Sequence, residues 1–254
     1  MKIAVTGKGG VGKSTIVALM ARVLKDSGLD VLIIDADPDM NQSTLLGIPD
    51  SRSITPIVEL KELIAERTGT EVGRSAPFFK MNPKVSDIPE KYWVEHRGIK
   101  LLVMGTIARG GGGCACPENA FLKSLLSHLV LSGDEWVLLD MEAGIEHLGR
   151  GTAVGVDLMI VVVEPNKTSF ETALRIKKLS SDLGLKKLGL IANKIQNLEE
   201  RAYVQEQAKQ HNLIGILEYN NELKKISTGE ISVMELSSGP IENIRRIIKT
   251  IKIR

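Results

Sequence analysis

Short apolar runs alternate with stretches of helical periodicity along most of this chain. Predominantly apolar runs are typical of parallel strands buried on both faces. They cover residues 3–5, 31–34, 99–104, 136–139, 158–163, 188–192 and 214–217. Apolar residues spaced for one face of a helix cover residues 14–27, 56–67, 117–131, 168–183, 198–210 and 240–252. This alternation predicts an α/β protein with a doubly wound, mostly parallel sheet flanked by helices.

The pattern also predicts a single domain over residues 1–254, because no internal repeat and no linker rich in Pro, Gly or Ser interrupts it. Residues 69–98 fit the pattern least well. Pro77, Pro83 and Pro89 break the periodicity there, so we expect an insertion or a mobile loop.

A glycine-rich loop joins the first predicted strand to the first predicted helix. It fits the phosphate-binding pattern GxxxxGK[ST] and consists of Gly7, Lys8, Gly9, Gly10, Val11, Gly12, Lys13, Ser14 and Thr15. Backbone N–H groups of such a loop cradle phosphates, and Gly9, Gly10 and Gly12 are expected to permit positive φ angles. Lys13 would reach the β- and γ-phosphates, while the Ser14 hydroxyl would bind Mg²⁺. The sequence therefore predicts a P-loop NTPase.

Acidic residues follow two further predicted strands. Asp37 comes after residues 31–34, where it could orient or deprotonate the attacking water. Asp140 comes after residues 136–139, in the position of a Walker-B carboxylate that supports Mg²⁺. Gly144 could place a backbone N–H near the γ-phosphate, as in a nucleotide switch. Catalytic roles are thus predicted for Asp37 and Asp140, alongside Lys13.

The strand at 188–192 leads into Asn193 and Lys194, which we expect in the nucleotide site. The amide of Asn193 could both donate to and accept from an adenine edge. Guanine-specific sites use Asn-Lys-x-Asp, whereas this chain has Gln196 at the fourth position, so ATP is favoured over GTP. Pro165 could contribute to the base pocket or could simply form a turn.

The overall charge and hydropathy limit the classes of partner. A formal net charge of +2 argues against a nucleic-acid partner. No apolar run approaches the roughly 18–20 residues of a membrane-spanning helix, and the first residues are strand-like rather than typical of a signal peptide. We therefore expect a cytoplasmic protein.

The two cysteines of the chain are Cys114 and Cys116, directly after four consecutive glycines. Two thiolates are too few for a closed zinc or nickel site, which usually needs about four ligands. Two copies related by a two-fold axis could supply four sulfurs, with Ni²⁺ or Zn²⁺ bridging the dimer. Pro117 would start a helix with Cys116 as its N-cap, where the helix dipole favours a thiolate. Two core thiols and a redox pair remain the alternatives.

Lys8, one residue after the first glycine of the loop, makes this loop resemble the deviant Walker A group. That group includes the nitrogenase iron protein and the Min and Par partitioning ATPases. The resemblance implies that Lys8 reaches the nucleotide bound by a partner subunit. It thereby implies a homodimer that forms with nucleotide and is reset by ATP hydrolysis.

Four stretches together resemble the carbon monoxide dehydrogenase maturation ATPases, the CooC family; they are residues 8–14, 35–38, 113–119 and 140–152. The similarity extends through residues 163–166 and 193–194. It implies an ATPase that supports nickel insertion, with carbon monoxide dehydrogenase as its client. A relative that matures acetyl-CoA synthase is not separated from this family by these motifs. Glu142, Glu146 and His147 could relay nucleotide state or assist a transiting metal.

Two other classes of protein remain as alternatives. A partitioning or membrane-positioning ATPase would use an interfacial C-terminal helix, whose apolar stripe comprises Ile241, Ile244, Ile247, Ile248 and Ile251. We consider membrane binding the weaker reading, because such a helix more often packs on its own domain. A reductase-type ATPase with an iron–sulfur cluster is the second alternative, although its cluster cysteines lie far apart in sequence.

Overall fold

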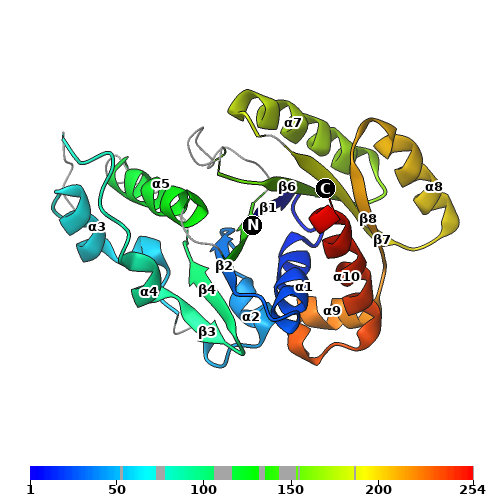
Figure 1. Ribbon diagram of the computed structural model, residues 1–254, viewed down its shortest axis with the longest axis horizontal. Helices are drawn as coiled ribbons and strands as arrows, with labels where there is room; N and C mark the ends of the chain where they lie inside the picture. Colours follow the sequence, from blue (N-terminus) through cyan, green and yellow to red (C-terminus); the bar gives the residue numbers. More distant parts are fainter. Residues whose placement is uncertain are drawn as a thin grey trace.

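The computed structural model describes residues 1–51, 54–72, 78–105, 116–131, 135–142, 153, 155–185 and 187–253. Its strands form one eight-stranded sheet (Figure 1). Their spatial order is β3 (Val94–His96), β4 (Ile99–Val103), β2 (Val31–Ala36), β5 (Trp136–Met141), β1 (Lys2–Gly7), β6 (Leu158–Val163), β7 (Leu188–Ile195) and β8 (Leu213–Glu218). Neighbouring strands pair in parallel except β3 and β4, which are antiparallel. The predicted fold class is therefore confirmed.

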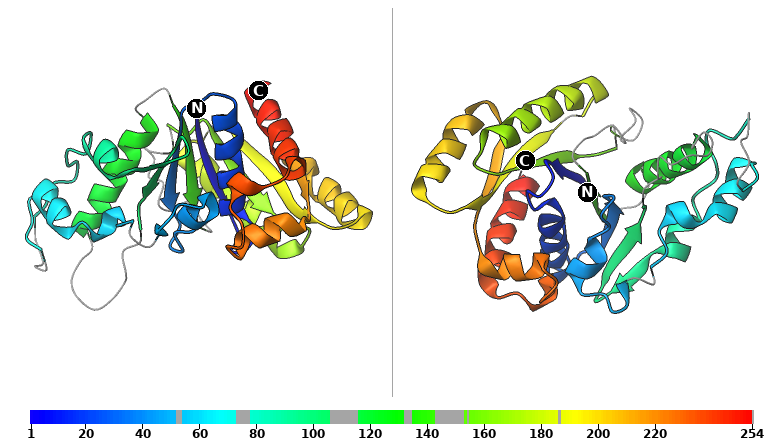
Figure 2. Two further views of the ribbon diagram at one scale, coloured as in Figure 1. Left: turned by 90° about the horizontal axis from the view of Figure 1, so that it is seen from below. Right: turned by 180° about the vertical axis from the view of Figure 1, so that it is seen from behind.

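Helices cover both faces of the sheet (Figure 2). One face packs against α1 (Lys13–Asp26), α2 (Gln42–Leu46), α9 (Asn221–Ser227) and α10 (Ser238–Ile253). The other face packs against α3 (Lys61–Thr68), α4 (Ile88–Tyr92), α5 (Cys116–Leu131), α7 (Lys167–Leu183) and α8 (Leu198–Gln207). Along β2, Ile33 joins the first core while Leu32 and Ile34 join the second. This alternation explains why the strand sequences are apolar throughout.

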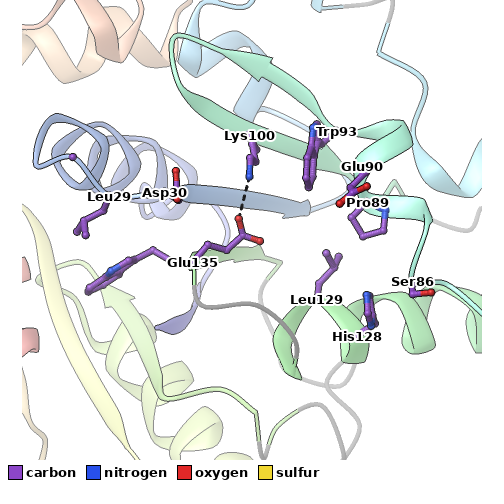
Figure 3. A pocket seen from close by; sticks show the side chains of 12 residues that line it. Leu29, Asp30, Ser86, Pro89, Glu90, Trp93, Lys100, His128, Leu129 and Glu135 are labelled. Atoms are coloured by element: carbon purple, nitrogen blue, oxygen red, sulfur yellow. Dashed lines mark hydrogen bonds and ion pairs between the residues drawn. The ribbon is translucent and has the colours of Figure 1, made fainter.

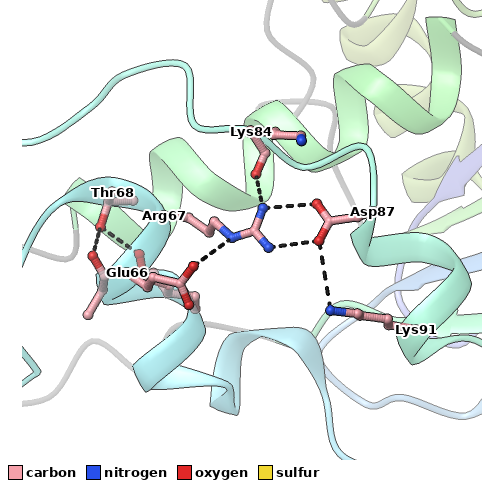
Figure 4. Close-up of polar contacts among 8 residues, drawn as sticks. Glu66, Arg67, Thr68, Lys84, Asp87 and Lys91 are labelled. Atoms are coloured by element: carbon pink, nitrogen blue, oxygen red, sulfur yellow. Dashed lines mark hydrogen bonds and ion pairs between the residues drawn. The ribbon is translucent and has the colours of Figure 1, made fainter.

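The part of the chain that fitted the pattern least well is folded where the structure describes it. The helix predicted at 56–67 is a 3-10 turn, Ile57–Glu59, followed by α3, and residues 78–98 contain α4 and the edge strand β3. Arg67 of α3 donates two hydrogen bonds to the carboxylate of Asp87, at 2.9 and 2.7 Å (Figure 4). This fork-to-fork contact joins α3 to the start of α4. The prediction of one domain stays a prediction.

The C-terminal helix α10 uses its apolar stripe inside the protein. Its five isoleucines at 241, 244, 247, 248 and 251 are at most 5% exposed and belong to the core beneath α1 and β8. The apolar face that supported the membrane alternative is therefore already covered. In the part of the chain that the structure describes, no helix is both long and apolar enough to cross a membrane.

Candidate nucleotide site

The carboxyl ends of β1, β2 and β5 lie side by side. We call this side of the sheet, formed by the carboxyl ends of its parallel strands, the carboxyl edge or nucleotide edge, and the opposite side the amino edge. In the strand register Asp140 of β5 lies beside Asp35 of β2 on one side and Val5 of β1 on the other. The phosphate loop follows β1 directly, and Asp37 follows β2. Since open parallel sheets bind ligands at this edge, the fold brings the predicted loop and both predicted carboxylates together.

The phosphate loop has the backbone conformation that its glycines allow. Gly12 precedes α1 with a φ of 93°, and a Cβ atom there would lie 2.5 Å from Nδ2 of Asn193. Gly10 has a φ of 80°. Gly9 does not have a positive φ, and a Cβ there would meet no atom within 4 Å. Because α1 starts from a glycine, no side chain caps its first N–H groups, as an anion-binding helix terminus requires.

Lys13, the first residue of α1, is buried and pairs with Asp37 across the site. The distance from Lys13 Nζ to Asp37 Oδ2 is 3.7 Å, and the two residues are only 7% and 8% exposed. The turn after β2 holds Asp37 in place: its N–H donates to Asp35, and its own carboxylate accepts from the N–H of Asp39. A buried ammonium and a buried carboxylate therefore face each other beside the loop.

Gln42, at the start of α2, joins the loop to both strand-end carboxylates. Its side-chain Nε2 donates to Asp140 Oδ2 at 2.7 Å and to the carbonyl oxygen of Ser14 at 3.0 Å. Its backbone N–H donates to Asp35 Oδ2 at 3.0 Å. Neither Gln42 nor Asp35 was predicted from the sequence as a site residue. Their short separation in sequence, at the end of β2 and the start of α2, was visible, but the contacts of Gln42 with β5 and α1 were not.

Burial dominates the electrostatics of this cluster. It raises the pKa of Asp35 from its ordinary value of 3.8 to about 7, with the charge of Asp140 as the next cause. Burial likewise raises the pKa of Asp140 to about 6, against the opposing hydrogen bonds from Gln42 and Ser14. The two carboxyls therefore disfavour being charged together, and a cation beside them would relieve this.

The residues around Asp140 fit a magnesium ion. Magnesium prefers oxygen ligands and retains several of its waters. Ser14 offers a hydroxyl next to Asp140. Oδ1 of Asp140 and Oε1 of Gln42 are buried acceptors that no hydrogen-bond donor reaches. An ion whose waters donate hydrogen bonds is suited to satisfy such acceptors.

Asn193 and Lys194, at the end of β7, both contact the phosphate loop. Asn193 Nδ2 donates to the carbonyl oxygen of Val11 at 2.8 Å, and Asn193 is only 6% exposed. Lys194 Nζ donates to the carbonyl oxygen of Gly10 at 2.7 Å and pairs with Glu164 at the same distance. The amide donor that was expected to face adenine is thus directed at the loop itself. These contacts brace the loop from the β7 side.

Lys8 lies on the surface and does not join the buried cluster. Its Nζ donates to Thr168 Oγ1 at 2.9 Å, near the start of α7. Thr168 in turn donates to Asn166, the N-cap of that helix. The side chain is therefore exposed beside the site, on the outside of its own subunit.

The cysteine pair lies largely outside the described residues. Cys114 falls in an undescribed stretch, as do Gly144, Glu146 and His147. Only the backbone of Cys116 is described. The helix α5 begins at Cys116, one residue earlier than predicted, and Pro117 lies in its first turn. Over the described ranges, no group of three or more His, Cys, Asp or Glu could hold a metal.

A cavity of about 590 Å³ lies at the amino edge, beside the amino ends of β2 and β5 (Figure 3). Asp30 and Glu135, which precede β2 and β5, line it together with both tryptophans of the chain, Trp93 and Trp136. Lys100 pairs with Glu135 at 3.4 Å and lies 4.5 Å from the ring centre of Trp93. This cavity is separate from the nucleotide edge.

Comparison with known proteins identifies the class of protein to which the chain belongs. Residues 2–233 match the CobQ/CobB/MinD/ParA nucleotide binding domain. The MinC:MinD cell division complex of Aquifex aeolicus superposes with a TM-score of 0.72 and 22% identity, over 99% of this chain and 95% of that one. That likeness shows the fold. Together, the fold, the phosphate loop and the family match define a P-loop ATPase.

Two relatives place the chain more narrowly. The carbon monoxide dehydrogenase accessory protein CooC of Rhodospirillum rubrum is 46% identical over 239 residues, covering 93% of this chain and 90% of the relative. An uncharacterized ATP-binding protein of Methanocaldococcus jannaschii is 45% identical over 228 residues, covering 89% and 88%. The chain therefore belongs to the CobQ/CobB/MinD/ParA nucleotide-binding family and, within it, to the CooC family.

Proposed function

We propose that this ATPase is a metallochaperone that supports nickel insertion into carbon monoxide dehydrogenase. The observation that carries the proposal is the meeting of the phosphate loop, Asp37 and Asp140 at one sheet edge in a chain 46% identical to a carbon monoxide dehydrogenase accessory protein. The site would account for ATP hydrolysis. The relative is an accessory protein of carbon monoxide dehydrogenase, and we infer the client from it. Acetyl-CoA synthase remains the alternative client, to be separated by testing both enzymes.

In the proposed mechanism the loop and the first turn of α1 bind the phosphates of ATP. Lys13 neutralises the β- and γ-phosphate oxygens, which compete with Asp37 for the same ammonium. Asp37, once released from that pair, orients the attacking water. Ser14 and Asp140 would hold Mg²⁺, which when bound would offset the negative charge of the phosphates. Asn193 and Lys194 serve nucleotide binding by holding the shape of the loop.

Two copies of the chain would act together. Lys8 is exposed at the nucleotide edge, which is the placement that contact with a nucleotide on a second copy requires. Its added positive charge would stabilise the transferring phosphoryl group, as an arginine finger does. The same pairing would bring together two Cys114 and Cys116 pairs, giving four sulfurs for Ni²⁺ or Zn²⁺ as cargo. ATP binding and hydrolysis would then couple to closing and opening of this metal site.

Metal analysis of the nucleotide-bound protein tests this function. We expect one Ni²⁺ or Zn²⁺ per dimer, and we expect Cys114→Ala or Cys116→Ala to abolish binding while ATP affinity is retained. Lys123→Ala, on the exposed side of α5, is the matched control and should keep the metal. Full metal occupancy in the double-alanine variant would rule out the bridging site. Nickel transfer to apo carbon monoxide dehydrogenase and to apo acetyl-CoA synthase would then identify the client.

A further inference from the structure

Gln42 is a fully buried polar residue, and its orientation is fixed by its neighbours. Its exposure is 0%. The two groups around its side-chain nitrogen, Asp140 Oδ2 and the Ser14 carbonyl oxygen, are both acceptors. Only an N–H₂ group can satisfy two acceptors, so the nitrogen of the amide must lie there and Oε1 must lie on the other side. Both N–H donors of the side chain are thereby used.

The remaining oxygen of this amide has no donor. Oε1 of Gln42 is buried without a hydrogen-bond partner, and so is Oδ1 of Asp140, the carboxylate that the amide holds. Leaving two such acceptors unsatisfied is costly, because each has lost its water on burial. A leucine or methionine would fill the same volume without that cost. The glutamine is therefore best explained by something that the two acceptors receive when the site is loaded.

We propose that Gln42 is a positioning residue for the magnesium–nucleotide complex: its amide sets the carboxylate of Asp140 against the phosphate loop. The contact joins three elements, namely α1 through Ser14, β5 through Asp140 and α2 through Gln42 itself. The two unsatisfied oxygens are the acceptors for the donor hydrogens of a hydrated cation. This inference rests on the magnesium site proposed above, and it adds the residue that fixes the position of the Asp140 carboxylate in that site.

The proposal separates metal-dependent from metal-independent nucleotide binding. Nucleotide phosphates contact the loop and Lys13 with or without Mg²⁺, so removal of the Gln42 amide should leave metal-free affinity nearly unchanged. The affinity gained on adding Mg²⁺ should fall, because Asp140 is no longer held where the ion needs it. If Gln42 only filled the core, its replacement would not weaken Mg²⁺-dependent binding selectively over metal-free binding.

The test is titration of the protein with ADP in EDTA and in Mg²⁺, for the wild type and for Gln42→Met. Methionine retains the volume and flexibility of glutamine but cannot donate to Asp140 or Ser14. We expect the Mg²⁺-dependent gain in ADP affinity to drop about tenfold, since the lost hydrogen bond is to a charged group, with metal-free affinity changed by less than about twofold. In ATPase assays the Mg²⁺ concentration for half-maximal rate should rise by a similar factor.

Gln42→Asn serves as the second variant if the methionine variant does not fold. Its amide is one methylene shorter and cannot span both acceptors, so an intermediate loss is expected. Gln205→Met, the same substitution on the exposed side of α8, should behave as the wild type. A wild-type Mg²⁺ dependence in folded Gln42→Met or Gln42→Asn would overturn the proposal, as would an equal loss of affinity in EDTA. A wild type that gains nothing from Mg²⁺ would overturn the magnesium site itself, and this proposal with it.

Discussion

The two edges of the sheet are built from the ends of the same strands, yet they differ in where charge lies. At the carboxyl edge, Lys13, Asp37 and Asp140 are at most 8% exposed, and burial raises the pKa of Asp140. At the amino edge, Lys100 and Glu135 form their pair with 27% and 22% of each side chain exposed. The charged cluster at the first edge is withdrawn from water, whereas the Lys100–Glu135 pair at the second edge stays partly in contact with it. A buried cluster of opposite charges, rather than the presence of charge, distinguishes the proposed nucleotide site.

Substitution of Lys8 should give the largest effect and would extend this comparison to an exposed residue. Lys8→Ala should retain ATP binding but lose nucleotide-driven dimerisation and at least about a hundredfold in ATP turnover, since a cation at the transferring phosphate is worth that or more. Phosphate release and light scattering, each with and without ATP, provide the measurement. Unchanged turnover would show that the buried cluster alone carries out hydrolysis and that Lys8 has no role across a dimer.

The pH dependence of stability tests the buried side of the comparison. The folded protein raises the pKa of Asp35 from 3.8 to about 7, mainly by burial, so the folded state holds this proton more tightly than the unfolded chain does. The free energy of unfolding of the nucleotide-free protein should therefore fall as pH rises from 5 to 8. In Asp35→Asn this part of the decline is removed, a difference of about 2 kcal/mol across that range.

Urea unfolding at pH 5 and pH 8 measures this difference. Asp182→Asn, on the exposed side of α7, is the matched control and should follow the wild type. Equal pH slopes for the wild type and Asp35→Asn would show that Asp35 is already charged in the folded protein. The description of the carboxyl edge as a place of disfavoured charge would then be wrong.

The smallest effect is expected at the amino edge. Lys100→Met keeps the apolar stem beside Trp93 and removes a partly exposed ion pair, so unfolding free energy should change by less than about 1 kcal/mol. ATP turnover should remain within about twofold of the wild type. The assays are the same urea titration and phosphate release used above. A tenfold loss of turnover would mean that the two edges are energetically coupled.

Much of the fold was predictable because the strands are buried on both faces. Such strands are apolar throughout, and each helix between them carries one apolar stripe, so both leave a clear periodicity. The edge strand β3 was missed, as were α2 and α9, because three to seven residues give too little periodicity to recognise. Packing of α10 on its own domain was the preferred expectation, but only the structure shows which elements its apolar stripe covers. An amphipathic stripe looks the same whether it covers a membrane or α1.

The candidate site divides in the same way. The phosphate loop, Asp37 and Asp140 were found from the sequence because their chemistry depends on local spacing and on the end of a strand. Gln42 was not found, because the role proposed for it depends on Asp140, which is 98 residues away in sequence, and on the carbonyl oxygen of Ser14. Asn193 was expected to face the base of the nucleotide, whereas its amide donates to the phosphate loop, and its role in nucleotide binding stays a prediction.

The sequence by itself determined the succession of features along the chain: an apolar strand, a glycine-rich loop, a helix, and carboxylates at the ends of later strands. Local spacing suffices there, because a phosphate loop is built from consecutive backbone groups. Only the tertiary structure decided which polar groups are buried together, since burial depends on the elements that cover a residue. It alone showed that Asp35, Asp140 and Gln42 share one buried cluster beside Lys13.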